Sequence, residues 1–370
     1  MAKSTYDYTI GIEEEYMIVD PTTGELTSAS AALIEEGKKR LGNLISTEMM
    51  KCQVEIGTPV CHSIQEAHQQ LLHIRKEVSD LAKSKGLAIV AAGTHPFSKW
   101  DQQSITSHER YHGIELENQI LARQLIICGM HMHIGIEDQE LRVDLMNQLR
   151  YFCPHLLALS TSSPMWEGHD TGLKSYRSVI FERFPRSGIP PALRSWNDYQ
   201  EYLDVAISTK SMDEPTKIRW DIRLSPRYPT LEFRICDVCT RVEDAIAICG
   251  LKVALVAKLL KLRKNNMQWR EYRKELIQEN KWRAVRYGLT GKLIDFGKKK
   301  EIDAKKLIFE LLTFVDDVVD DLGIRDEVSH IHQILTEGTS AERQLRVFKE
   351  EKSAKAVVDM LIKDTLLGIE

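Results

Sequence analysis

The segment that decides the fold is YTIGIEEEYMIV, residues 8–19, in which three consecutive glutamates interrupt an apolar run. Side chains alternate between the two faces of a strand, so Glu13 and Glu15 share one face and Glu14 points to the other. Two carboxylates on one face suit a hard cation, although a solvated edge strand with a charged outer face explains the segment equally well by itself. Glu14 needs a partner that the sequence does not identify, because a buried unpaired carboxylate is costly.

Four other segments repeat this alternation: CQVEIG (52–57), CGMHMHIGIE (128–137), IRWDIRL (218–224) and TLEFRIC (230–236). Their second face carries these charged or imidazole side chains: Glu55, His131, His133, Arg219, Asp221, Arg223, Glu232 and Arg234. A mainly antiparallel sheet with one face against helices and one face open gives this pattern. Carboxylates and imidazoles suit divalent metals and arginines suit phosphate, so the open face predicts phosphoryl transfer from a nucleotide. No Walker A or kinase glycine loop is present, and we expect the nucleotide to lie on the sheet.

Composition indicates a globular protein of ordinary charge. The chain has 370 residues, 43% hydrophobic and 28% charged, with a formal net charge of -4, which does not favour a nucleic-acid partner. Its most apolar helical segment, 245–262, contains Lys252 and Lys258, which favours a core helix over a membrane span. The N-terminus does not read as a secretory signal, so we expect a cytoplasmic protein with no membrane partner. Its seven cysteines fit reduced thiols, and we interpret Cys236 and Cys239 as structural thiols because a zinc site would need a second pair.

We expect one catalytic domain over residues 1–370. Residues 1–241 are predicted to be mainly sheet and active-site loops, and residues 242–370 mainly helices. A helix is predicted over 63–86, with Ser63 as its N-cap and Gly86 as its stop.

Several longer motifs resemble one known family. They are GIEEEY (11–16), EIGTPV (55–60), GTHPF (93–97), GMHMHIG (129–135), SSPMWEGHDTGLKSYRS (162–178), WDIRLSPRYPTLEFRICDVCT (220–240) and NKWRAVRYGL (280–289). Together they resemble the YbdK-type carboxylate–amine ligases, the second glutamate–cysteine ligase family, from residue 9 to about 290 and more weakly beyond. GMHMH and LEFR also resemble glutamine synthetase. The resemblance implies an α+β fold with a curved, mainly antiparallel sheet, helices packed on one face and an open active-site face.

The resemblance also implies roles for individual residues. The metal ligands for Mg²⁺ or Mn²⁺ would be Glu13, Glu15, Glu55, His131 and Glu232. The residues near the ATP phosphates would be His133, Arg223, Arg227 and, on weaker grounds, Arg283. Arg234 would contact the substrate carboxylate or the transferred phosphoryl group, with Arg177 as a further anion-binding candidate. Arg177 and Arg283 are also explained as surface or ion-paired residues. Asp221 is either a ligand or a structural partner of Arg219 or Arg223.

The activity implied is an ATP-dependent carboxylate–amine ligase that forms an amide through an acyl phosphate. Weak glutamate–cysteine ligase activity on L-glutamate and L-cysteine is the leading case, and the resemblance suggests a homodimer. The alternatives are a ligase that joins glutamate to another amine and a non-catalytic nucleotide or metal sensor.

Three further features are interpreted with less support from the motifs. Glu167 and Asp170 are candidates for the base that deprotonates the amine. We hypothesise that residues 337–350 close over the site. The DDxxD spacing of Asp316, Asp317 and Asp320 is interpreted as a solvated helix face and not as a prenyl-diphosphate site, because the chain has too many strands for that all-helical fold.

Overall fold

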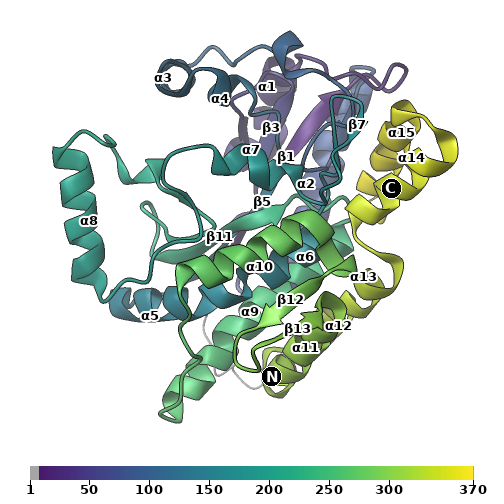
Figure 1. Cartoon of the computed structure of the whole chain (residues 1–370). Coiled ribbons are helices and arrows are strands. Elements are labelled where there is room, and N and C mark those ends of the chain that lie inside the picture. The colour runs from purple at the N-terminus through teal and green to yellow at the C-terminus, as the bar shows by residue number, and fades with distance from the viewer. Residues whose placement is uncertain (1–7, 370) are drawn as a thin grey trace.

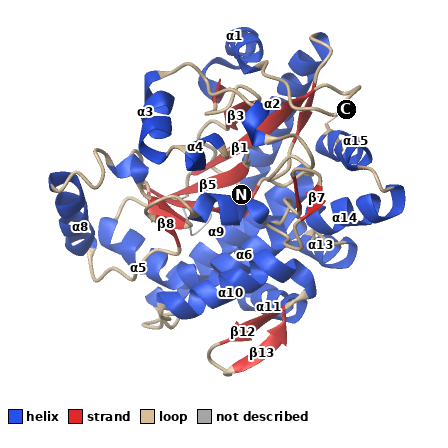
Figure 2. Ribbon diagram, turned by 45° about the horizontal axis from the view of Figure 1, so that its top comes forward, coloured by secondary structure: helices blue, strands red, loops and turns tan. Residues whose placement is uncertain are grey.

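A seven-stranded sheet forms the centre of the computed structural model, which describes residues 8–369 (Figures 1 and 2). The strand order is β10-β11-β5-β1-β3-β2, and β4 pairs with β1. Every adjacent pair is antiparallel. The strands are β1 Ile10–Val19, β2 Ile45–Thr47, β3 Gln53–Gly57, β4 Ala88–Val90, β5 Gly129–Gly135, β10 Ile222–Leu224 and β11 Thr230–Asp237. The predicted α+β fold with a mainly antiparallel sheet is confirmed.

Three small two-stranded sheets lie outside the central one. They are β6 (Met165–Trp166) with β7 (His169–Asp170), β8 (Ser187–Gly188) with β9 (Arg219–Trp220), and β12 (Lys292–Asp295) with β13 (Lys300–Asp303). The β8–β9 pair is parallel, and the other two are antiparallel.

Helices cover the apolar face of the sheet, where α2 packs on β1, α9 on β5, α6 on β11 and α5 on β10. The helices are α1 Ser30–Leu41, α2 Ile64–Ser84, α3 Glu109–Asn118, α4 Ile120–Arg123, α5 Gln139–Leu149, α6 Cys153–Ser160, α7 Tyr176–Glu182, α8 Trp196–Ser208, α9 Val242–Lys264, α10 Lys274–Tyr287, α11 Ala304–Leu322, α12 Arg325–Ser329, α13 Ile331–Glu337, α14 Ser340–Glu351 and α15 Ala354–Thr365. The predicted start of α2 is confirmed, because the Ser63 hydroxyl accepts a hydrogen bond from the Glu66 amide at 3.0 Å.

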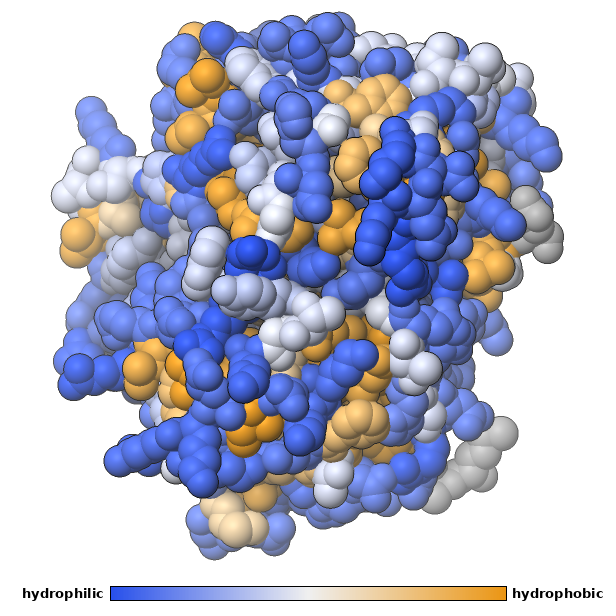
Figure 3. Space-filling view, turned by 45° about the vertical axis from the view of Figure 1, so that its right-hand side comes forward, coloured by the Kyte–Doolittle hydropathy of each residue, from blue (hydrophilic) through white to orange (hydrophobic). Residues whose placement is uncertain are grey.

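Across residues 8–369, no helix combines the length and the apolar character needed to cross a membrane. The face seen in Figure 3 is mostly hydrophilic, with small apolar patches scattered over it.

The partner of Glu14 is Arg75, a buried arginine of α2. Arg75 Nε and Nη2 donate to the two carboxylate oxygens of Glu14, each at 2.8 Å. The Tyr16 hydroxyl donates to the same carboxylate. Arg75 also donates to the carbonyls of Cys239 and Thr240 at 2.8 and 2.7 Å. The charge of Glu14 is therefore fully compensated beneath the sheet.

The strand pattern departs from strict alternation at two places. The segment predicted as one strand, 218–224, is divided into β9 and β10 at Asp221, which forms a buried ion pair with Lys281 at 2.7 Å. The structural partner of Asp221 is thus Lys281 and neither of the arginines we expected. In β11 the pairing with β5 shifts between Phe233 and Cys236, so an extra residue separates Glu232 from the strand end.

Two further motifs noted in the sequence have structural explanations. Asp316, Asp317 and Asp320 are all exposed on α11, which confirms the predicted solvated helix face. Asp316 and Asp320 pair with Arg325, and Asp317 pairs with Lys258. All seven cysteines are buried and free, including Cys236 and Cys239.

The segment proposed to close over the site is instead a packed helix. In α14, Gln344 Nε2 donates to the Ser162 carbonyl at 2.8 Å, and the Ala341 amide donates to the Thr161 carbonyl at 3.0 Å. These bonds and the burial of Gln344 tie the segment to the body of the protein. We therefore withdraw the closing-segment hypothesis.

Candidate active site

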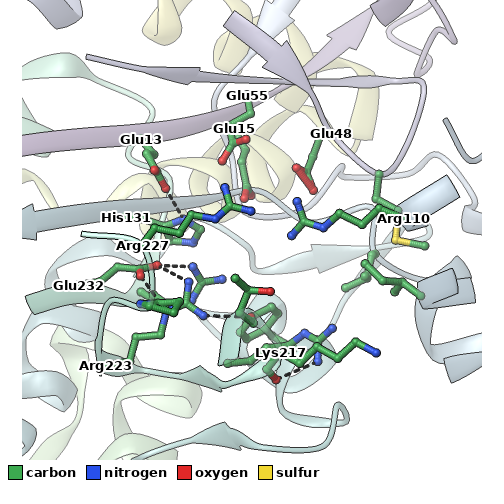
Figure 4. A pocket seen from close by; sticks show the side chains of 18 of the residues that line it. Glu13, Glu15, Glu48, Glu55, Arg110, His131, Lys217, Arg223, Arg227 and Glu232 are labelled. Atoms are coloured by element: carbon green, nitrogen blue, oxygen red, sulfur yellow. Dashed lines mark hydrogen bonds and ion pairs between the residues drawn. The ribbon is translucent and has the colours of Figure 1, made fainter. Parts of the chain in front are cut away.

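The polar face of the sheet forms the floor of a cavity of about 620 Å³. Strand register brings its charged residues together. Glu13 on β1 lies opposite His131 on β5, and Glu15 on β1 lies opposite Glu55 on β3. Glu232 on β11 lies opposite both His133 on β5 and Arg223 on β10. Figure 4 shows Glu13, Glu15, Glu55 and Glu48 on one side of this cavity, Glu232 with Arg223 and Lys217 on the other, and His131 between Glu13 and Glu232.

Two overlapping groups of side chains on the cavity floor have the geometry of cation sites. Glu13, His131 and Glu232 form one, and Glu15, Glu55 and His131 form the other; within each group the ligand atoms lie within 4.8 Å of one another. His131 Nδ1 is 3.3 Å from Glu13 Oε2, while its buried Nε2 has no hydrogen-bond partner among the described residues. Carboxylates with an imidazole suit Mg²⁺ or Mn²⁺, and an orphaned buried ring nitrogen is a ready ligand atom. The residues present therefore fit divalent cations.

Burial and crowding shift the pKa values of several side chains in the cavity. Burial, together with the charges of Glu48, Glu13 and Glu15, raises the pKa of Glu55 well above its usual value. Burial raises the pKa of Glu13 as well, but hydrogen bonds and charge interactions with His131 and His133 outweigh it and lower that pKa. Burial, reinforced by the Arg234 guanidinium, lowers the pKa of His131, which favours the neutral, metal-binding imidazole.

Glu48 is a fifth carboxylate of the cavity, which the sequence analysis missed. It lines the cavity just beyond β2, and burial together with the Glu15 charge raises its pKa to about 7. The sequence shows no alternating run at this short strand, and the strand register reveals the face: Ser46, two residues before Glu48, lies opposite Glu55 and donates to it at 3.0 Å. Residues two apart on an extended chain share a face, so Glu48 belongs with the acidic group.

Two arginines hold Glu232 in place. Arg223 donates to both of its carboxylate oxygens, at 2.7 and 3.0 Å, and Arg234 donates to one of them at 2.5 Å. These arginines outweigh the effect of burial and lower the pKa of Glu232, so the carboxylate stays charged. The Arg234 guanidinium lies 5.8 Å from the Phe181 ring, and that of Arg177 lies 5.5 Å from the same ring. Arg177 is buried and lines the cavity beside them.

The remaining cofactor candidates differ in their positions. His133 lines the cavity, with Nδ1 2.8 Å from the Thr230 hydroxyl and Nε2 3.6 Å from Glu13 Oε1. Arg227 also lines the cavity. The cavity wall includes two further cationic residues that the sequence analysis did not single out, Arg110 from α3 and Lys217.

The comparisons with known proteins cover nearly the whole chain. The model of "Glutamate-cysteine ligase family 2(GCS2)" matches residues 9–359. The chain belongs to glutamate–cysteine ligase family 2. A protein of Herpetosiphon aurantiacus named "Putative glutamate--cysteine ligase 2" is 51% identical over 98% of this chain and 94% of its own length. One of the same name from Roseiflexus castenholzii is 50% identical over 100% of this chain and 97% of its own length.

Solved structures support the fold independently. The glutamate–cysteine ligase of Francisella tularensis, solved in complex with AMP, aligns with a TM-score of 0.70 at 14% identity, over 99% of this chain and 91% of that one. The bifunctional glutathione synthetase of Pasteurella multocida also gives a TM-score of 0.70, at 16% identity, over 97% of this chain and 52% of that one. Membership in glutamate–cysteine ligase family 2 confirms the resemblance seen in the motifs and the enzyme class, an ATP-dependent ligase that forms C–N bonds.

Three residues singled out from the motifs of this family lie away from the cavity. Arg283 of α10 forms ion pairs with Glu279 at 2.8 Å and Glu301 at 2.6 Å and is not among the cavity-lining residues. The ion-paired alternative explains it, and we no longer count it as an ATP-binding candidate. Glu167 and Asp170 lie in the β6–β7 hairpin, outside the cavity wall, so neither has the position of a base.

Proposed function

We propose that the protein uses ATP to activate the side-chain carboxylate of L-glutamate and joins it to an amine, with L-cysteine as the leading amine. One observation carries this proposal: the acid–imidazole groups and the arginines that hold Glu232 share a single cavity. A carboxylate is a poor electrophile, and transfer of the γ-phosphoryl group of ATP makes it an acyl phosphate that an amine can attack. Amide, ADP and phosphate result.

Divalent cations would be held by Glu13, Glu15, Glu55, His131 and Glu232. When bound, Mg²⁺ or Mn²⁺ supplies Lewis-acid neutralisation of the negative charge on the phosphate oxygens. Glu48 adds a further carboxylate on the same side of the cavity. This donor set, with its orphaned His131 nitrogen, supports the cofactor assignment.

The cationic residues would bind and orient the two negatively charged reactants. We propose that Arg223, Arg227 and His133 lie beside the ATP phosphates, and that Arg234 and Arg177 bind the acid carboxylate or the phosphoryl group in transfer. The acid carboxylate and the ATP phosphates are both negatively charged and repel each other in water. Fixed guanidinium groups in a partly enclosed cavity offset this repulsion and hold the two reactants in a reactive orientation. Positioning and charge stabilisation of this kind are the main contribution a protein makes to such a transfer.

The cell compartment and the assembly belong to the same proposal. Seven free, buried thiols support a reducing compartment such as the cytoplasm. The homodimer stays a prediction, to be tested by light scattering on the purified protein.

The test of this function is ADP release with Mg²⁺-ATP and L-glutamate, with and without L-cysteine, followed by other acids and amines. Turnover that needs both an acid and an amine, and that disappears in Glu232→Gln, is the expected result. ADP release with neither substrate would indicate an ATPase. Tight ATP binding without ADP release under any combination would indicate the nucleotide sensor instead.

A further inference from the structure

Arg177 extends from α7 into the cavity, and a buried carboxylate lies beside its guanidinium on the side away from the cavity. Asp237, at the end of β11, is fully buried and lies opposite Gly129 in the strand register. Arg177 Nη1 is 3.9 Å from Asp237 Oδ1, and its Nη2 donates to the Arg234 carbonyl at 3.4 Å. A separation of 3.9 Å is longer than a hydrogen bond, so Asp237 attracts the guanidinium without occupying its donors.

Three serines fix the Asp237 carboxylate, and we call them the serine cradle: Ser162, Ser163 and Ser175. The Ser162 amide and the Ser163 hydroxyl donate to Oδ2 at 2.9 and 2.7 Å, and the Ser175 hydroxyl donates to Oδ1 at 2.8 Å. The cradle also holds Arg177 directly, because the Ser163 hydroxyl accepts from the Arg177 amide at 3.1 Å. One group of residues thus sets both the carboxylate and the start of the helix that carries the arginine.

Two glycines leave the space that the Asp237 and Arg177 side chains occupy. A Cβ added to Gly93 would lie 2.9 Å from Asp237 Cγ, and a Cβ added to Gly129 would lie 2.2 Å from Arg177 Nη2. Any side chain at Gly129 would therefore push the guanidinium away from the sheet. Both glycines belong to motifs noted in the sequence, GTHPF and GMHMHIG.

Asp237 is separated from the cavity, whereas Arg177 lines it. Among residues 8–369, Arg177 Nε has no hydrogen-bond partner although it is buried. A buried unpaired donor is costly, and a bound anion would remove that cost. Arg177 is therefore a cavity-lining side chain that lies beside Asp237 and still has a donor to offer an anion.

We propose that Asp237, held by the serine cradle, is a positioning residue that fixes the Arg177 guanidinium for the anion bound in the cavity. The identity of that anion, the phosphoryl group in transfer, rests on the proposed function. The positioning itself rests on the contacts of Asp237 with Arg177 and the cradle.

The experiment is a double-mutant cycle with Asp237→Asn, which keeps the size of the side chain and removes its charge, and Arg177→Lys. We expect Asp237→Asn to lower kcat/KM for the acid about tenfold in the wild-type background and to have almost no further effect on Arg177→Lys. The matched control is Asp244→Asn. Asp244 is also a buried aspartate paired with an arginine, Arg343 at 3.2 Å, but it lies in α9, outside the cavity wall. The Asp244→Asn substitution should lower thermal stability and leave kcat/KM unchanged.

A second readout separates this proposal from the proposed function. The dissociation constant of the protein for a β,γ-imido analogue of ATP, in the presence of Mg²⁺, is measured by calorimetry. It is measured for the wild type, the two single variants and the double variant, and it requires no turnover. If the wild type never releases ADP, the ligase function fails while the cycle on the dissociation constant still decides the positioning role. Equal losses from Asp237→Asn in both backgrounds, in kcat/KM and in analogue affinity, would overturn it. If Asp237→Asn does not fold, Ser163→Ala takes its place in the cycle with the same expectation.

Discussion

Glu48→Gln should stabilise the metal-free protein while abolishing its activity. The pKa of Glu48 rises from the ordinary value of 4.5 to about 7, because the half-buried carboxylate loses hydration and lies near the Glu15 charge. One pKa unit corresponds to about 1.4 kcal/mol, so ionising Glu48 costs the folded metal-free protein up to about 3 kcal/mol at pH 8. Glu48 is only half-buried, and solvent screening reduces the expected gain to about 1–3 kcal/mol.

The gain in stability from Glu48→Gln should depend on pH. Between pH 4.5 and about 7 the folded state holds a proton on Glu48 that the unfolded state has released, so this group increasingly destabilises the folded wild type as the pH rises through that range. The gain of Glu48→Gln should therefore be largest near pH 8 and disappear near pH 4.

The assay is urea unfolding with a chelator at both pH values, with ADP release measured separately. Glu350→Gln, a change at an exposed residue of α14, is the matched control and should leave both unchanged. A Glu48→Gln protein that is less stable than wild type at pH 8 would refute the view that the acidic group is strained without metal.

Three further predictions concern the rest of the fold. Arg75→Met should cost about 3–5 kcal/mol in denaturant unfolding, because it leaves the buried Glu14 charge without its partner. Adding Glu14→Gln should recover part of that loss, and a double variant no more stable than the single one would contradict the pairing. Burial lowers the pKa of His95 from 6.5 to about 3, so its contribution to stability is complete above pH 6.5 and falls by about 2 kcal/mol by pH 5. The stability difference between wild type and His95→Gln should shrink over that range, and a constant difference would exclude His95 as the cause. Asp320→Asn should leave turnover and ATP affinity unchanged, since Asp320 is an exposed partner of Arg325; a loss of either would reopen the DDxxD segment as a site.

The alternation of residues along the strands was sufficient to predict the polar face of the sheet. Side-chain direction on a strand depends only on local geometry, so Glu13, His131 and Glu232 could be assigned to one face before their strands were paired. The register that then brings Glu15 opposite Glu55 is a long-range property, and the sequence supported it only through the family resemblance.

The failures share a physical cause, which is dependence on a distant partner or on irregular backbone. Glu48 lies beyond the end of a short strand, where alternation gives no visible run. Arg75 sits within the apolar stripe of a helix, and Lys281 lies far along the chain from Asp221, so neither ion pair has a local signature. Arg283 shows the converse: a short motif indicated an anion site, but two nearby glutamates neutralise the side chain at the surface.

The most direct test of the central claim follows oxygen from the acid to the released phosphate. The enzyme is incubated with Mg²⁺-ATP, L-cysteine and L-glutamate in which both side-chain carboxylate oxygens are ¹⁸O, and the inorganic phosphate is analysed by mass spectrometry. Activation of the carboxylate in this cavity predicts that each phosphate released with an amide carries one ¹⁸O atom. Phosphate without the label, formed at the same rate as ADP, would contradict an acyl phosphate and with it the account of the cavity as a carboxylate-activating site.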